Sequence, residues 1–185
     1  MTGSTAEGIL TAVEEILTSE GIEGVSIRNV AKRAGVSIGA VQHHHHTKDD
    51  LLMAAMDEVG RRFIERVMAA TDLAATPLAN LAAVSRILGG VDDESRIASV
   101  VWLAFASKAA TSEAVARAHR DAWLTMERGL TTLLQQVNPL LGENDAAALM
   151  ALLDGIAIAR ATETERMTAT RAGDIIGAFL DRFKA

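Results

Sequence analysis

The chain has 185 residues, of which 49% are hydrophobic and 3% aromatic, and its formal net charge is −6. It contains no cysteine, which excludes disulfide bonds and thiolate metal sites. Because aromatic residues and prolines are few, the composition favours helices over strands, and we predict an all-α protein.

The first residues and the apolar runs bear on localisation. The segment MTGSTAEGIL lacks a basic stretch followed by an apolar core, so it does not predict a secretory signal. The longest uncharged stretch near Trp102, IASVVWLAFAS, is too short to span a bilayer. We therefore expect a cytoplasmic protein that does not enter a membrane.

The first predicted helix covers residues 6–19, where apolar residues recur at helical spacing. A short helix follows, with Ser26 as its cap and Gly35 at its end. Ser37 would cap a second short helix that runs to about His45. Two short helices in succession after a longer one make a compact N-terminal unit.

A long helix is predicted to begin at residue 48, where Thr47 and Asp50 have the spacing of a capping box. Beyond it, apolar periodicity predicts five more helices, at about residues 78–88, 94–110, 112–137, 146–164 and 170–183. The prediction is thus an all-α fold of about nine helices, with an N-terminal domain over residues 1–47 and a second helical domain over residues 48–185.

Basic residues are concentrated near the N-terminus of this acidic chain. Residues 24–48 contain Arg28, Lys32, Arg33 and Lys48 and no Asp or Glu, which gives the segment a charge of +4. A local basic patch on an acidic protein is typical of a nucleic-acid-binding surface.

The two short helices predict a helix-turn-helix. Ala31 is small enough for the helices to approach closely, Gly35 stands four residues on where the turn needs a positive φ, and Val41 follows six residues later. The second helix would then present four residues toward a DNA groove: Ile38, Gly39, Gln42 and His43.

The segment VSIRNVAKRAGVSIGAVQHHHHTKDDLLMAAM resembles the DNA-binding region of the tetracycline-repressor (TetR) family of bacterial transcription regulators. In that family the helix-turn-helix is followed by a long helix that begins at a lysine, and Lys48 stands in that place. The resemblance implies a repressor, not an enzyme, that needs no cofactor and is released from a palindromic DNA operator by a small-molecule effector.

The resemblance carries the family's DNA contacts to nine positions: Ser26, Arg28, Ser37, Ile38, Gly39, Gln42, His43, His44 and Lys48. The serines would offer hydroxyls and helix N-termini to phosphates, and Gln42 is suited to adenine. Two positions depart from the family pattern, because Gln42 replaces the usual Tyr and His45 the usual Phe.

Four consecutive histidines, His43 to His46, admit more than one interpretation. Successive helical residues turn by about 100°, so two of them at most, His43 and His46, share a face, which makes a poor metal site. His45 and His46 could pack at the end of the helix while His43 and His44 face DNA. An all-α metal- or small-molecule-binding protein that uses His43, His46 and Asp49 or Asp50 is the alternative, as is a regulator-like bundle that has lost DNA binding.

The resemblance also implies a homodimer and an effector pocket. The candidate dimer residues lie on the last two helices: Leu149, Leu153, Ile156, Ile175, Ile176, Phe179 and Phe183. The candidate pocket residues are Met56, Trp102, Phe105, His119, Trp123 and Met126, since aromatic and Met side chains line adaptable apolar pockets. Both sets could instead be plain core, and His119 falls on the apolar stripe of its helix.

Overall fold

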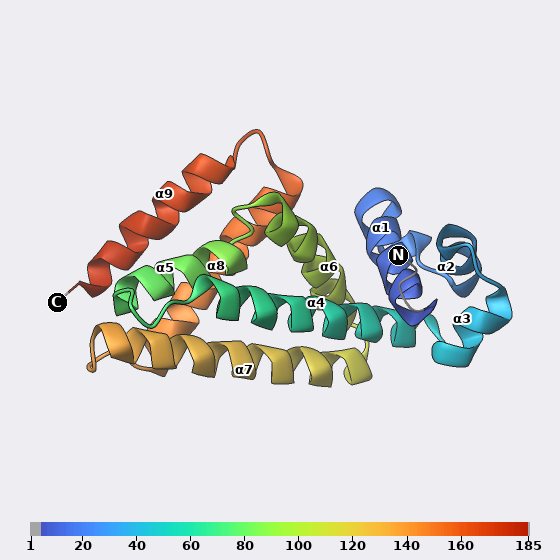
Figure 1. The fold of residues 1–185 in the computed structure, drawn as a ribbon, viewed down its shortest axis with the longest axis horizontal. Helices are drawn as coiled ribbons and strands as arrows, with labels where there is room; N and C mark the ends of the chain where they lie inside the picture. The colour runs from blue at the N-terminus through green and yellow to red at the C-terminus, as the bar shows by residue number, and fades with distance from the viewer. Residues whose placement is uncertain (1–4, 185) are drawn as a thin grey trace. The chain divides into compact units, whose positions relative to one another are not determined.

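The computed structural model describes residues 5–184, which contain helices and no strand (Figure 1). The described helices are α1 (Thr5–Gly24), α2 (Ile27–Ala34), α3 (Ile38–His44), α4 (Lys48–Ala70), α5 (Pro77–Leu88), α6 (Asp93–Ala109), α7 (Glu113–Val137), α8 (Glu143–Thr162) and α9 (Ala169–Leu180), with a short 3-10 helix, η1 (Asp181–Phe183), after α9. The all-α prediction is confirmed. Among the described residues, each helix falls short of the length and apolarity that a membrane crossing requires.

The helix ends follow the predicted local signals. Ser26 caps α2 by accepting the backbone N–H of Asn29 at 3.2 Å, and Ser37 caps α3 by accepting that of Ala40 at 3.0 Å. Gly35 ends α2 with φ at 68°, the left-handed region that glycine enters at least cost. The predicted residue types therefore do set these boundaries.

The start of α4 has the predicted capping box. The Thr47 hydroxyl accepts the backbone N–H of Asp50 at 3.0 Å, and the Asp50 carboxylate accepts that of Thr47 at 2.9 Å. The hydrogen bond to the Thr47 side chain contributes most to lowering the pKa of Asp50. Three residues separate the end of α3 at His44 from the start of α4 at Lys48, and the last of them is the capping residue Thr47.

The chain divides into two compact units, and α4, α6 and α7 contribute to both. The first unit comprises Met1–Arg61 and Val100–His119, and the second comprises Arg62–Ser99 and Arg120–Ala185. The domain boundary predicted at residue 47 stays a prediction.

The first unit has its own hydrophobic core. It is built from the inner faces of α1, α2, α3, the start of α4 and Val101 of α6. Its buried members are Ile9, Ala12, Val13, Ile16, Leu17, Val25, Val30, Ala31, Val41, Leu51, Leu52, Ala55 and Val101. Burial of the inner faces leaves the opposite faces of α2 and α3 to the solvent.

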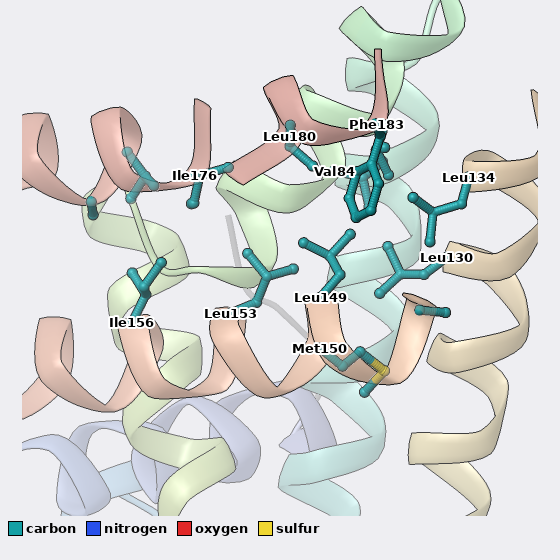
Figure 2. Packing of buried hydrophobic residues seen from close by; sticks show 14 of the residues in the cluster. Val84, Leu130, Leu134, Leu149, Met150, Leu153, Ile156, Ile176, Leu180 and Phe183 are labelled. Carbon is teal, nitrogen blue, oxygen red and sulfur yellow. The ribbon is translucent and has the colours of Figure 1, made fainter. Parts of the chain in front are cut away.

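The second unit has a larger core between α5, α7, α8 and α9. Figure 2 shows Leu149, Leu153 and Ile156 of α8 pointing toward Ile176 of α9 and Phe183 of η1. Burying each such side chain contributes about 1.5–3 kcal/mol relative to leaving it exposed.

A buried arginine joins three segments of the second unit. Arg160 of α8 donates to the backbone carbonyls of Gly90 at 3.1 Å, Met167 at 2.9 Å and Val91 at 3.4 Å. The side chain is 5% exposed, and all three acceptors lie in loops. Arg160 thereby ties the turn between α5 and α6, and the loop before α9, to α8.

Candidate nucleic-acid interface

The helix-turn-helix exposes most of the residues predicted to bind DNA. Lys48 is half-buried, and the other eight are exposed: Ser26, Arg28, Ser37, Ile38, Gly39, Gln42, His43 and His44. On α3 the inner residue is Val41, which is fully buried, whereas Ile38 is 45% exposed. The outward face of α3 is therefore free to enter a DNA groove.

Both capping serines retain a hydrogen atom for a phosphate. Ser26 and Ser37 use their hydroxyl oxygens as acceptors for the first turns of α2 and α3. A hydroxyl has one O–H donor besides its acceptor lone pairs, so each serine can cap its helix and donate to a phosphate at once.

The predicted basic patch is weaker than its four cations suggest. Arg33 Nη2 lies 2.6 Å from Glu20 Oε1, and Arg33 Nη1 lies 3.6 Å from Glu15 Oε2. Lys48 Nζ is 4.0 Å from Glu23 Oε2. The formal charge of +4 on residues 24–48 is therefore partly offset, because acids that precede this segment in the sequence lie beside two of its cations.

Arg28 and Lys32 are the cations of this patch that stay available. Both side chains are exposed, and neither has an acidic partner within the described part of the chain. They are four residues apart on α2 and therefore share one face. Lys32 was missing from the predicted DNA contacts, although its spacing from Arg28 is a signal that would have found it.

The histidines differ in their surroundings. The rings of His43 and His44 are 5.3 Å apart and T-shaped, and both residues are exposed, as is His46. His45 is half-buried, and burial, followed by the charge of His44, lowers its pKa. In residues 5–184, no three His, Cys, Asp or Glu side chains are placed to hold a metal ion.

Comparison with known proteins decides the family. Residues 9–55 match the model for bacterial regulatory proteins of the tetR family, and residues 77–184 match the model for the C-terminal part of BetI-type transcriptional repressors. The chain belongs to the TetR family. The TetR resemblance found in the sequence is thereby confirmed.

Individual relatives are similar to this protein over nearly the whole chain. The HTH-type transcriptional regulator PksA of Bacillus subtilis is 31% identical over 176 residues, which cover 91% of this chain and 84% of PksA. A transcriptional regulator from Rhodococcus sp. Rha1 has a crystal structure with a TM-score of 0.88 at 31% identity, covering 96% of this chain and 95% of that one. A regulator from Saccharomonospora viridis, solved in complex with choline, shares the fold with a TM-score of 0.86 at 18% identity, covering 95% of each chain.

Membership of the TetR family makes the protein a ligand-responsive, DNA-binding regulator of transcription, and not an enzyme. The helix-turn-helix then accounts for DNA binding. The C-terminal region matched by the BetI-type model contains α5 to α9.

The six TetR-type pocket candidates do not all belong to one compact unit. Trp102, Phe105 and His119 lie together in the first unit, where the rings of Trp102 and His119 stack at 4.7 Å. Burial lowers the pKa of His119. Met56 is half-buried in the same unit, whereas Trp123 and Met126 pack against the core of the second unit. Their role in effector binding stays a prediction.

Most of the candidate dimer residues are buried within the single chain. Ile175 and Phe179 are half-buried, and the remaining five are buried: Leu149, Leu153, Ile156, Ile176 and Phe183. Sequence periodicity identified an apolar side of α8 and α9, but this side faces the core of its own chain. The outward side consists largely of small residues, including Ala148, Ala151, Gly155, Gly177 and Ala178, beside Ile158, which is 45% exposed.

Proposed function

We propose that the protein is a homodimeric repressor that binds a palindromic DNA operator and leaves it when a small-molecule effector binds. The observation that carries the proposal is the exposed face of α3, which stands beside two unpaired cations of α2. One helix-turn-helix reads few base pairs, so members of this class dimerise and read two half-sites about one helical turn apart.

The exposed residues suit distinct roles on DNA. Arg28 and Lys32 would bind phosphates and set the orientation of the protein, and they carry most of the salt dependence. Gln42 can form two hydrogen bonds with adenine, and Ile38 can contact a thymine methyl group. His43 lies next to them on α3 and would read a base edge or a phosphate.

The dimer surface that we propose is the outward side of α8 and α9. Family membership and the exposed Ile158 support it. Small residues at Ala151 and Gly155 would allow the helices of a second copy to approach closely. The buried Leu153 would then support α8 from within its own chain instead of touching the partner.

Release from DNA would pass through α4. This helix continues from Lys48, directly after the helix-turn-helix, to Ala70. Lys108 in the last turn of α6 lies 3.1 Å from the carboxylate of Asp49 in the first turn of α4. An effector that displaces α6 would therefore pull on the start of α4, change the separation of the two recognition helices and favour the unbound state.

An organic cation is the effector class that we propose to test first. Choline is bound to the Saccharomonospora viridis regulator of the same fold. In this chain, Asp154 of α8 is half-buried and has no hydrogen bond or ion pair to another described residue, and burial raises its pKa to about 6. Burial disfavours the ionised form of an unpaired carboxylate, and a bound cation would stabilise that form. Calorimetric titration of choline into the wild type and into Asp154→Asn tests this, and equal affinities would rule out the role of Asp154.

Selection from a random duplex pool at one stated salt concentration tests the main proposal. We expect a palindrome with half-sites about one helical turn apart. Recovery of a single, non-repeated site would contradict the dimeric arrangement. Salt-sensitive binding without sequence preference would contradict operator recognition and direct attention to Gln42 and His45.

A further inference from the structure

Glu20, near the end of α1, bonds two side chains of α2. Its Oε2 accepts a hydrogen bond from Asn29 Nδ2 at 2.9 Å, and its Oε1 accepts one from Arg33 Nη2 at 2.6 Å. Asn29 and Arg33 are four residues apart, so their side chains leave the same face of α2. One carboxylate thus holds two successive turns of the first helix of the helix-turn-helix.

The backbone between α1 and α2 is shaped around this carboxylate. Asn29 Nδ2 also donates to the backbone carbonyl of Gly24 at 2.9 Å. A Cβ on Gly24 would lie 2.6 Å from the Cβ of Glu20 and 2.9 Å from its Oε2. Because side chains do not approach this closely, position 24 has to be glycine for Glu20 to keep its place.

Two neighbouring cations of α2 consequently differ in what they can bind. The guanidinium of Arg33 lies between the carboxylates of Glu20 and Glu15. The side chain of Lys32 is exposed and has no acidic partner among the described residues. A cation that is already neutralised by carboxylates releases few counterions on meeting DNA, whereas a free cation releases about one per phosphate.

We propose that Glu20 is a positioning residue for DNA recognition: without touching DNA, its carboxylate fixes α2 and keeps Arg33 from phosphate. The placement of α2 decides where Arg28 and Lys32 meet the DNA backbone while α3 lies in the groove. The proposal rests on the DNA-binding function of the family. From net charge alone, removal of an acidic residue should tighten binding to every duplex. The proposal predicts the opposite for Glu20 on the operator.

The first experiment compares Glu20→Ala with Glu15→Ala on the selected operator and on a scrambled duplex at the same salt concentration. Glu15→Ala removes the same charge from α1 but no hydrogen bond, because Glu15 is 3.6 Å from Arg33. We expect Glu20→Ala to lose about tenfold in operator affinity without a loss on the scrambled duplex, since two charge-assisted hydrogen bonds are removed. Glu15→Ala should keep the wild-type ratio of the two affinities.

Two outcomes of this experiment would overturn the proposal. One is operator binding by Glu20→Ala that equals or exceeds that of the wild type. The other is an equal loss on both duplexes, which indicates a folding defect instead of a misplaced α2. Thermal unfolding of each variant identifies such a folding defect, because a variant with a misplaced α2 should keep a melting temperature close to that of the wild type.

A second experiment measures the salt dependence of DNA binding for Lys32→Gln and Arg33→Gln, which remove the same charge from adjacent positions. We expect Lys32→Gln to reduce the slope of log affinity against log salt by about one per subunit. Arg33→Gln should leave that slope unchanged while weakening operator binding, and Arg33→Lys should restore affinity. Equal reductions of the slope would place Arg33 on phosphate and overturn the proposal. Because the slope can be measured on any duplex, failure to recover an operator would count against the proposed function alone.

Discussion

Arg66 of α4 bonds the residue that caps α6. Arg66 Nη2 donates to Asp92 Oδ2 at 2.8 Å, and Arg66 Nη1 donates to the buried hydroxyl of Ser95 at 2.8 Å. Asp92 Oδ1 accepts the backbone N–H of Ser95 at 2.9 Å, which is the contact of a helix cap. Burial alone would raise the pKa of Asp92, but the hydrogen bonds from Ser95 and Arg66 outweigh it and lower that pKa. Asp92 therefore caps α6 and attaches it to α4.

Replacing Arg66 by Met should weaken this attachment. We expect a loss of roughly 1–2 kcal/mol in the free energy of unfolding, because Asp92 and Ser95 each lose a hydrogen bond to a charged donor. Urea denaturation measures it. Arg61→Met is the control, since Arg61 pairs with Glu58 one turn earlier in the same helix. Equal effects of the two changes would show that the contact with α6 contributes nothing.

Asp154→Asn should change how stability depends on pH. Burial raises the pKa of Asp154 from 3.8 to about 6, so the folded state binds this proton more tightly than the unfolded state. The wild type should therefore lose stability as pH rises from about 4 through 6. Asn does not ionise, and the variant should be more stable at pH 8 by on the order of 1–3 kcal/mol. Urea denaturation at pH 5 and pH 8 checks this, and a variant less stable at pH 8 would contradict it.

Operator affinity should be higher at pH 6 than at pH 8, because histidine side chains in general carry more positive charge at the lower pH and the exposed His43 and His44 would face phosphate. Burial, followed by the charge of His44, lowers the pKa of His45, so His45 should contribute less to this effect than its exposed neighbours. Fluorescence anisotropy at fixed salt between pH 6 and pH 8 measures the effect. The double variant His43→Asn, His44→Asn should lose this pH dependence of operator affinity. His119→Phe should retain it. A wild-type affinity that is constant over this range would refute the role of the histidines.

Arg160→Met should destabilise the second unit. Removing the guanidinium orphans the carbonyls of Gly90, Val91 and Met167, and the smaller desolvation cost of Met offsets part of this loss. We expect a net loss of roughly 1–3 kcal/mol, read from urea denaturation. Arg171→Met removes one exposed hydrogen bond, from Arg171 to the carbonyl of Arg166, and should cost less than about 0.5 kcal/mol. A similar cost for both variants would mean that burial of Arg160 is unimportant.

Ile158→Glu should convert the proposed dimer into a folded monomer, because it places a charge on the outward side of α8. Sedimentation velocity and circular dichroism report the mass and the helix content. Ile64→Glu is the matched control, since Ile64 is 57% exposed on α4 and lies outside the proposed surface. A dimer that persists in Ile158→Glu would place the interface elsewhere. Leu153→Glu is a poor test, because Leu153 is buried in its own chain and the change would unfold it.

Local signals in the sequence were sufficient for much of the fold. The periodicity of apolar residues located the helices, and Ser26, Ser37 and Thr47 marked the starts of three of them. Each signal acts over one or two helical turns, so it depends little on the rest of the chain. The end of the first predicted helix is confirmed, because the backbone of α1 leaves the helical region at Gly21 (φ 71°, ψ −173°) before a short further segment runs to Gly24. The last predicted helix stops earlier than expected, at Leu180, and a 3-10 turn continues to Phe183.

The sequence by itself determined the helix-turn-helix and the exposed face of α3, because the turn glycine, the caps and the alternation of buried and exposed positions are local. Only the tertiary structure decided which cations stay free and which apolar residues face the solvent. Glu20 meets Arg33 from another helix, and the apolar side of α8 turns toward its own chain. Such pairings depend on how helices pack, and neither spacing nor composition encodes that packing directly.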